Sequence, residues 1–342
     1  MSTAAAALRR MRLVGSWVRP SLTGMDLEEP GIGSWRFASA VAALAIAGWI
    51  IAVGSGRYTQ IIIALGCSYL VAALGYNLVA GYAGQLAFGQ AAFLAISAYV
   101  YTVLVHVGTA VVIAFVAAVL ASMLAAAVVG LAVLRTRHFY LALVTLAFSE
   151  TVVLFLQRWP ATNGDDGISV NLNGSDAVYV TIVVAALALI FVDRLVRSPL
   201  GRAFRMVNSD ENAAAAMGVA IARTRIIAFV LSGLFGGIGG ILLAGTLGFI
   251  TPENFSIGLT VLLLTMIVIG GMGSIWGTIV GTAVIVVIAD VYSVAVGFQD
   301  IFYGIVLFVA LVLMPGGLVS LPDRVRAALR RLFSLASEHR GP

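Results

Sequence analysis

The sequence contains no lysine, so its 20 basic residues are all arginine. A P-loop needs a phosphate-binding lysine and a Schiff-base enzyme needs an amine, so the chain does not hydrolyse ATP by the usual P-loop design. Cys67 is the only cysteine, and the three histidines (His106, His138 and His339) stand far apart. These scarcities argue against a disulfide framework, a metal site and a Cys or His catalytic centre.

Charge is scarce as well, at 10% of the residues, whereas 61% are apolar. Mean hydropathy is +1.07. A soluble domain of this size cannot hide so much apolar surface, so the composition indicates an integral membrane protein. The apolar runs are long enough for helices and lack the alternation of a membrane barrel. The net charge of +5 is explained better by a positive-inside bias than by binding to nucleic acid.

Apolar runs of about 20 residues predict an all-α protein with about ten transmembrane helices. Five spans on each side of the middle permit a 5+5 inverted repeat with broken helices near the centre. The predicted spans are Phe37–Gly54, Tyr58–Ala80, Gly84–Val105, Thr109–Leu134, His138–Gln157, Ala177–Val196, Ile226–Ile250, Ile257–Gly270, Ile275–Val296 and Ile301–Pro315.

The arginines predict the orientation of these spans. With the amino terminus in the cytoplasm, 18 arginines fall inside and only Arg57 and Arg158 fall outside. We therefore expect both termini to be cytoplasmic. The domains expected are an amino-terminal tail (1–36), a transmembrane domain (37–315) that contains a cytoplasmic loop (198–220), and an Arg-rich carboxy-terminal tail (316–342). No cleavable signal peptide is apparent.

The segment Thr162–Asp176 falls outside the membrane in this topology. It carries three acids (Asp165, Asp166 and Asp176), three asparagines and no arginine. It is either a plain solvated loop or a docking surface for an external partner.

Polar side chains inside apolar runs are costly unless they face the bundle or a water-filled path. They are therefore candidates for a translocation path, and the alternative is a structural hydrogen bond between helices. The candidates are Asn77, Gln85, Gln90, Glu150 and Asp290. No lysine or histidine stands near the two acids in sequence, so a proton relay is not evident.

Glycines recur at four-residue spacing in the later spans, which is typical of closely packed helices. We expect helix packing there, within the chain or across a subunit interface, and Gly270–Gly277 forms a hinge or a plain turn. The packing glycines are Gly233, Gly236, Gly237, Gly240, Gly273, Gly277 and Gly281.

The longest polar interruption of the apolar region is Ser198–Gly218. Pro199 disfavours helix at Ser198. A short helix capped near Asn208 or Ser209, with acids in its first turn and a stop at Gly218, is expected beside the membrane. Such a helix suits contact with a cytoplasmic partner, and an ordinary connecting loop is the alternative.

Four blocks resemble the M-type permease subunits of branched-chain amino acid ABC importers. They are Tyr76–Tyr99 (YNLVAGYAGQLAFGQAAFLAISAY), Phe139–Glu150 (FYLALVTLAFSE), Pro199–Gly240 and Ile267–Gly277 (IVIGGMGSIWG). Each block is only moderately specific, and the four in this order are specific together. The resemblance runs from about Tyr58 to Pro315.

The resemblance implies a permease of the bacterial plasma membrane that pairs with an H-type permease, two cytoplasmic ATPases and an external substrate-binding protein. This chain would bind no cofactor, because ATP and Mg would be used by the ATPase subunits. The family's Glu-Ala-Ala…Gly docking loop matches here with Asn212 inserted after the glutamate. The residues expected at the ATPase contact are Arg202, Arg205, Asp210, Glu211, Ala213, Ala214 and Gly218.

Two other functions stay open at this point. Permeases for urea or short amides are closely similar, since specificity in such systems lies largely in the binding protein. An ion-coupled secondary amino acid transporter would instead use Glu150 or Asp290 and would need no ATPase.

Overall fold

The structure is a computed structural model that describes residues 34–133, 138–162, 164–170, 176–291 and 317–318. The chain divides into two compact units, Met1–Ala40 and Val41–Pro342. Only the opening turns of one helix are described in the first unit. Predicted span Ile301–Pro315 lies outside the described residues, as do the amino-terminal tail up to residue 33 and the carboxy-terminal tail beyond residue 318.

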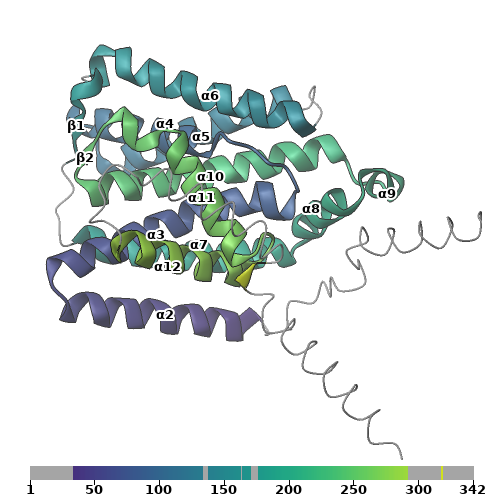
Figure 1. Cartoon of the computed structure of the whole chain (residues 1–342), viewed down its shortest axis with the longest axis horizontal. Coiled ribbons are helices and arrows are strands. Elements are labelled where there is room, and N and C mark those ends of the chain that lie inside the picture. The colour runs from purple at the N-terminus through teal and green to yellow at the C-terminus, as the bar shows by residue number, and fades with distance from the viewer. Residues whose placement is uncertain (1–33, 134–137, 163, 171–175, 292–316, 319–342) are drawn as a thin grey trace, which may run out of the picture. The chain divides into compact units, whose positions relative to one another are not determined.

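Helices make up nearly all of the described chain (Figure 1). The α-helices are α2 Ser34–Gly54, α3 Arg57–Asn77, α4 Gln90–His106, α5 Val111–Val133, α6 His138–Arg158, α7 Asp176–Arg197, α8 Pro199–Ser209, α9 Glu211–Ala216, α10 Ile221–Leu247, α11 Ile257–Gly270 and α12 Ile275–Val291. The short turns are η2 Leu78–Tyr82 (a π-helix), η3 Pro160–Thr162, η4 Gly164–Asp166 and η5 Pro252–Phe255.

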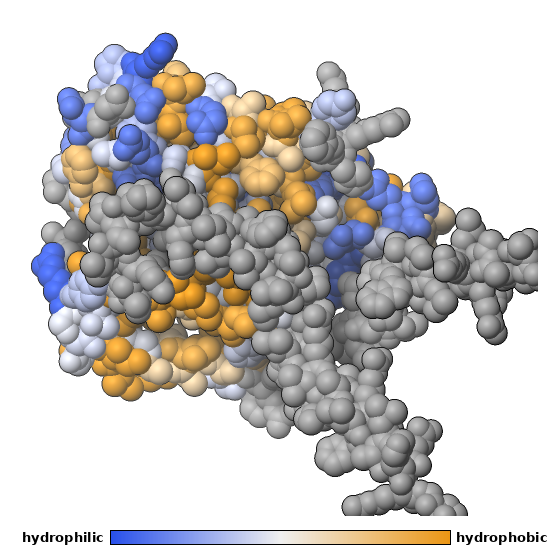
Figure 2. Space-filling view, viewed as in Figure 1, coloured by the Kyte–Doolittle hydropathy of each residue, from blue (hydrophilic) through white to orange (hydrophobic). Residues whose placement is uncertain are grey.

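Seven of the described helices are long and apolar enough to cross a membrane, and α4 and α12 are shorter apolar helices. The chain is therefore an all-α membrane protein. On the face that Figure 2 shows, apolar residues cover the middle of the bundle, and hydrophilic residues gather near β1 and around α8 and α9. This is the distribution that a lipid-facing surface requires.

Two predicted boundaries were wrong. The span predicted from Gly84 begins at Gln90, because the segment before it is not helical and Gly84 takes a left-handed φ of 67°. The span predicted over Ile226–Ile250 is α10, which starts earlier, at Ile221. It ends at Leu247 because the next residues leave the helix and form strand β2.

Helix α10 packs against α3, α4 and α5 at the centre of the second unit. Its glycines let three backbones approach at once. A methyl group added at Gly233 or Gly237 would meet α5 residues near Ser122, and one added at Gly240 would overlap the Leu94 carbonyl of α4. Gly236 also faces α4, and Gly239 faces Ala72 on α3.

A two-residue strand pair closes one end of the bundle. Strand β1 (Ile168–Ser169) pairs antiparallel with β2 (Phe249–Ile250), and Ile168 stands opposite Ile250. Helix α10 runs from α9 to this pair over 27 residues, or roughly 40 Å at 1.5 Å per residue. The segment around Asp166 and the α8–α9 loop therefore lie at opposite ends of α10 (Figure 1).

Candidate functional site

The polar stretch after α7 forms two helices. The first, α8, starts with Pro199 after Ser198 in extended conformation, which suits the first helical position. Its buried residues are Gly201, Phe204 and Val207, a three-residue repeat that places one apolar face on the bundle. The sequence treated this segment as a lead-in loop, and it is instead an amphipathic helix that contacts α7, α10 and η2.

Arg202 and Arg205 point back toward the end of α7. Arg202 donates to the Arg197 carbonyl at 3.4 Å, and Arg205 donates to the Val196 carbonyl at 3.3 Å. Carbonyls at the end of a helix lack partners within the helix and favour nearby cations. In the described structure these two arginines therefore join α8 to α7.

Helix α9 is capped by Asp210. The Asp210 carboxylate accepts hydrogen bonds from the N–H groups of Asn212 at 2.8 Å and Ala213 at 3.1 Å. The predicted cap at Asn208 or Ser209 was wrong, because α8 continues through both residues and the backbone becomes extended only at Asp210. The predicted stop at Gly218 coincides with a left-handed residue of φ 82°.

The faces of α9 differ in what they touch. Glu211 forms an ion pair with Arg225 of α10, and Ala214 is buried at 2% exposure. Ala213, Ala215 and Ala216 are exposed, and Met217 follows them at 70% exposure. Sequence reasoning missed Met217, although a large apolar residue beside a predicted cytoplasmic turn is a signal that could have found it.

Asn208, at the end of α8, reaches irregular backbone of the bundle. Its amide nitrogen donates to the Gly81 carbonyl of η2 at 3.0 Å. A methyl group added at Gly84 would overlap the same side chain. The non-helical segment that follows, Ala83–Gly89, is also held by α6, because Phe88 N–H donates to the Thr145 hydroxyl at 2.8 Å.

Asn77 and Gln90, predicted for the path, have partners within the chain. Asn77 joins α3 to the turn between α11 and α12, since it accepts from Gly273 N–H at 2.9 Å and donates to the Thr278 hydroxyl at 2.9 Å. Gln90 accepts from the Ser232 hydroxyl of α10 at 2.6 Å. Hydrogen bonding between helices, the alternative role, describes both contacts.

The other three path candidates differ from these. Gln85 is 2% exposed, and neither its Oε1 nor its Nε2 has a hydrogen-bond partner in the described part of the chain. Glu150 lies on α6 and is partly exposed. The backbone of Asp290 belongs to α12, and its side chain lies outside the described residues. The structure does not bring the five candidates into one cluster.

The later glycines lie where α11 and α12 meet. Methyl groups added at Gly277 and Gly281 would overlap backbone atoms of α11. Gly273, in the turn before α12, has a φ of 77° and faces the Gly81 carbonyl. The turn Gly271–Ser274 therefore packs on η2 and lies beside the contacts of Asn208.

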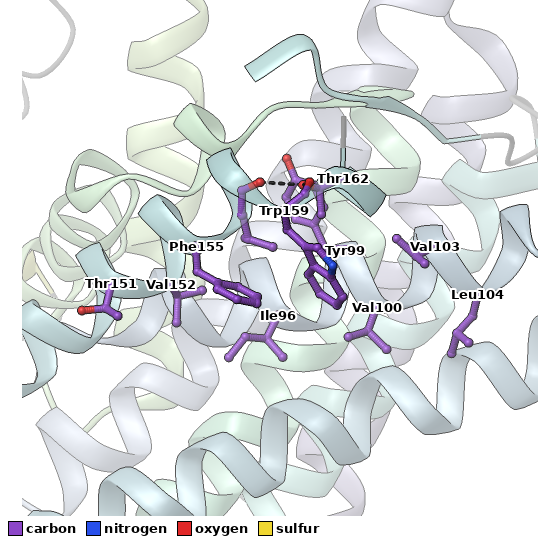
Figure 3. Close-up of a pocket in the computed structure, with 11 residues that line it drawn as sticks. Ile96, Tyr99, Val100, Val103, Leu104, Thr151, Val152, Phe155, Trp159 and Thr162 are labelled. Carbon is purple, nitrogen blue, oxygen red and sulfur yellow. Dashed lines mark hydrogen bonds between the residues drawn. The ribbon is translucent and has the colours of Figure 1, made fainter. Parts of the chain in front are cut away.

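An apolar cavity of about 500 Å³ opens between α4 and α6, at the end near η3 (Figure 3). Tyr99 and Val103 line it from α4, and Phe155, Trp159 and Thr162 line it from the other side. Its lining carries no charged group, so it suits an apolar moiety and not a free zwitterion. Within the residues that the structure describes, no group of three or more His, Cys, Asp or Glu could hold a metal ion.

Comparison with known proteins gives this architecture a family. The family described as branched-chain amino acid transport system, permease component, matches residues 58–314. The high-affinity branched-chain amino acid transport system permease protein LivM of Escherichia coli K12 is 32% identical over 310 residues, 79% of this chain and 70% of the relative. LivM of Salmonella typhimurium is 31% identical over 306 residues, with the same coverage.

A second kind of permease is related too. LivH of Salmonella typhimurium is 26% identical over 292 residues, 76% of this chain and 94% of the relative. No solved structure matches. The profile match covers most of the chain and the LivM identities exceed 30%, so the chain belongs to the family of branched-chain amino acid transport system permease components.

Proposed function

We propose that this chain is a membrane permease subunit of a binding-protein-dependent ABC importer that carries branched-chain or related amino acids. Family membership and the names of the LivM relatives support this function. The chain would work beside a second, H-type permease of the same family, and the likeness to LivH supports such a pair. Two ATPase subunits, which use ATP and Mg, and an external binding protein complete the proposed complex.

The carrying observation is the presentation of α9. This six-residue helix is capped at Asp210 and tied to α10 by the ion pair of Glu211 with Arg225. It turns Ala213, Ala215, Ala216 and Met217 away from the bundle. Small residues allow close approach, and an exposed methionine is an adaptable contact for a hydrophobic groove. We assign this outward face to the ATPase, with Glu211 and Ala214 holding its orientation.

The proposed topology places α8 and α9 in the cytoplasm and the segment around Asp166 outside a bacterial plasma membrane. The arginine distribution supports this orientation, as do the opposite positions of the two segments along α10. We retain ten spans in two sets of five, with both termini cytoplasmic. ATP binding would close the ATPase pair, α8 and α9 would move with it, and the spans would expose the path to alternate sides.

The docking surface can be tested on the assembled importer. We expect Met217→Ser to reduce ATPase co-purification with the permease pair by ~5- to 30-fold, as for loss of a contact worth 1–2 kcal/mol. Thermal stability of the permease should be unchanged because the side chain is exposed. Val107→Ser is the matched control, since Val107 is 78% exposed at the end of α4. Equal ATPase recovery from Met217→Ser and wild type would contradict the assignment.

Substrate class is tested in proteoliposomes that contain the whole importer and its binding protein. We expect labelled leucine uptake to require ATP and to persist when proton and sodium gradients are collapsed. An excess of unlabelled isoleucine should compete, and urea should not. Uptake that follows an ion gradient without ATP would instead support a secondary transporter.

A further inference from the structure

One polar side chain, Asn208, joins the α8–α9 loop to the interior of the bundle. Its amide nitrogen donates to the Gly81 carbonyl at 3.0 Å, and its side chain fills the space that a Cβ at Gly84 would occupy. The absence of side chains at both glycines creates the slot for Asn208. A movement of the end of α8 therefore acts directly on η2 and the segment after it.

Gly81 is held from its other side by the turn between α11 and α12. A Cβ at Gly81 would overlap both the Asn77 carboxamide oxygen and the Gly273 nitrogen. Those two atoms are themselves hydrogen-bonded at 2.9 Å. Asn77 also donates to the Ser274 carbonyl at 3.1 Å and to the Thr278 hydroxyl at 2.9 Å. Asn208, Gly81, Asn77 and the turn Gly271–Ser274 thus form one continuous chain of contacts.

The backbone inside this chain of contacts is suited to rearrangement. The turn η2 is a π-helix, in which Ala83 N–H donates to the Leu78 carbonyl at 3.0 Å, and Gln85 N–H reaches back to the Val79 carbonyl at 2.9 Å. Single π turns are typical of functional sites in helices. The described state also leaves both amide atoms of buried Gln85 without partners. An arrangement that satisfies Gln85 would recover this desolvation cost, so the two arrangements need not differ greatly in free energy.

We propose that Asn208 is a positioning residue that transmits movement of α8 and α9 through Gly81 and Asn77 to the α11–α12 turn. The proposal rests on the proposed function, because it presumes that an ATPase moves α8 and α9. Asn208 itself is exposed, whereas Asn77 is 1% exposed. Changing Asn208 therefore breaks the transmission and leaves the buried contacts that hold the fold in place.

The test uses the complete importer in proteoliposomes and measures leucine uptake per ATP hydrolysed. We expect Asn208→Ala to keep ATPase association and to lower this ratio by ~5- to 10-fold, within the usual range of coupling between sites. Asn208→Asp should act alike, because a carboxylate cannot donate to the Gly81 carbonyl. Ser209→Ala is the matched control, since the Ser209 hydroxyl bonds only within α8, to the Arg205 carbonyl.

A second pair of variants tests the glycine slot. Gly84→Ala and Gly248→Ala impose the same backbone strain, because φ is 67° at one and 70° at the other. A Cβ at Gly84 would displace Asn208, whereas one at Gly248 meets nothing within 4 Å. We expect only Gly84→Ala to lower uptake per ATP.

A conformational readout follows the far end of the relay. Met272, 45% exposed in the α11–α12 turn, is replaced by cysteine in a Cys67→Ala background. The labelling rate at this site should change on ATP binding in the otherwise native complex, and this change should be lost with Asn208→Ala. If native complexes show ATP-driven uptake and Asn208→Ala alters neither readout, the relay alone is overturned. Native complexes without ATP-driven uptake would overturn the proposed function and the relay with it.

Discussion

At Gly240 the fold has no space for a single methyl group. A Cβ there would overlap the Leu94 carbonyl and the Ser97 hydroxyl of α4. Backbone atoms cannot yield as a flexible side chain can, so the cost is that of an overpacked core, about 1–3 kcal/mol. We expect Gly240→Ala to lower the unfolding temperature of the purified permease in detergent.

The matched control for Gly240→Ala is Gly48→Ala. A Cβ at Gly48, in α2, meets nothing within 4 Å, and alanine is the better helix former. Gly48→Ala should therefore leave the unfolding temperature unchanged or raise it slightly. Equal losses in the two variants would show that helical glycine content, and not close approach, matters here.

Glycine spacing predicted close packing but could not identify the partners. Gly233 and Gly237 face α5, whereas Gly236 and Gly240, three residues further along the helix, face α4. A three-residue offset turns a helix by about 300°, so both pairs fit the same sequence pattern. Which neighbour each face meets depends on the tertiary arrangement, which the pattern does not contain.

At the scale of the element, α9 is too short to persist alone. A helix of six residues lacks the length that offsets nucleation, so its cap and its ion pair to α10 matter more than its propensity. Replacing Asp210 by alanine removes both capping hydrogen bonds, at a cost of ~1 kcal/mol. We expect Asp210→Ala to speed amide hydrogen exchange in α9 about fivefold and to weaken ATPase association.

Asparagine caps helices about as well as aspartate. Asp210→Asn should therefore restore slow amide exchange and ATPase association, whereas the exposed neighbour change Ser209→Ala should affect neither. Unchanged exchange in Asp210→Ala would show that α9 is held by its contacts with α10 alone.

Hydropathy located the long helices because a run of about 20 apolar residues has few other uses. It could not place the irregular Ala83–Gly89 segment inside the apolar run that it interrupts. It also missed α8, whose apolar face is only Gly201, Phe204 and Val207. The strand pair β1–β2 was not foreseen, since two residues per strand leave no periodic signal. Among the site residues, the roles of Asp210 and Met217 depend on boundaries that propensity fixes poorly.

At the scale of the whole molecule, the topology predicts opposite accessibility for two exposed residues, Ala216 and Asp166. In a Cys67→Ala background, we expect Asp166→Cys to react with a membrane-impermeant maleimide in intact spheroplasts. Ala216→Cys should react only in inverted vesicles. The physical reason is that α10 separates the two positions by about the thickness of a membrane.

Detergent-solubilised protein is the control for this measurement, because both cysteines should then react at similar rates. Reaction of both variants from the same side of the membrane would contradict the proposed topology. Reaction of each variant from the side opposite to its prediction would keep the fold and invert the orientation.

The contact between Asn77 and Thr278 has a consequence for biogenesis. The two residues are 201 positions apart in the chain, which corresponds to roughly 10–40 s of translation at ~5–20 residues per second. During that interval α3 is already made, while the partner of its buried carboxamide has not yet been synthesised. A nascent permease interrupted before α12 would therefore expose an unpaired amide at the end of α3. Membrane quality control could use such an amide to distinguish incomplete chains from finished ones.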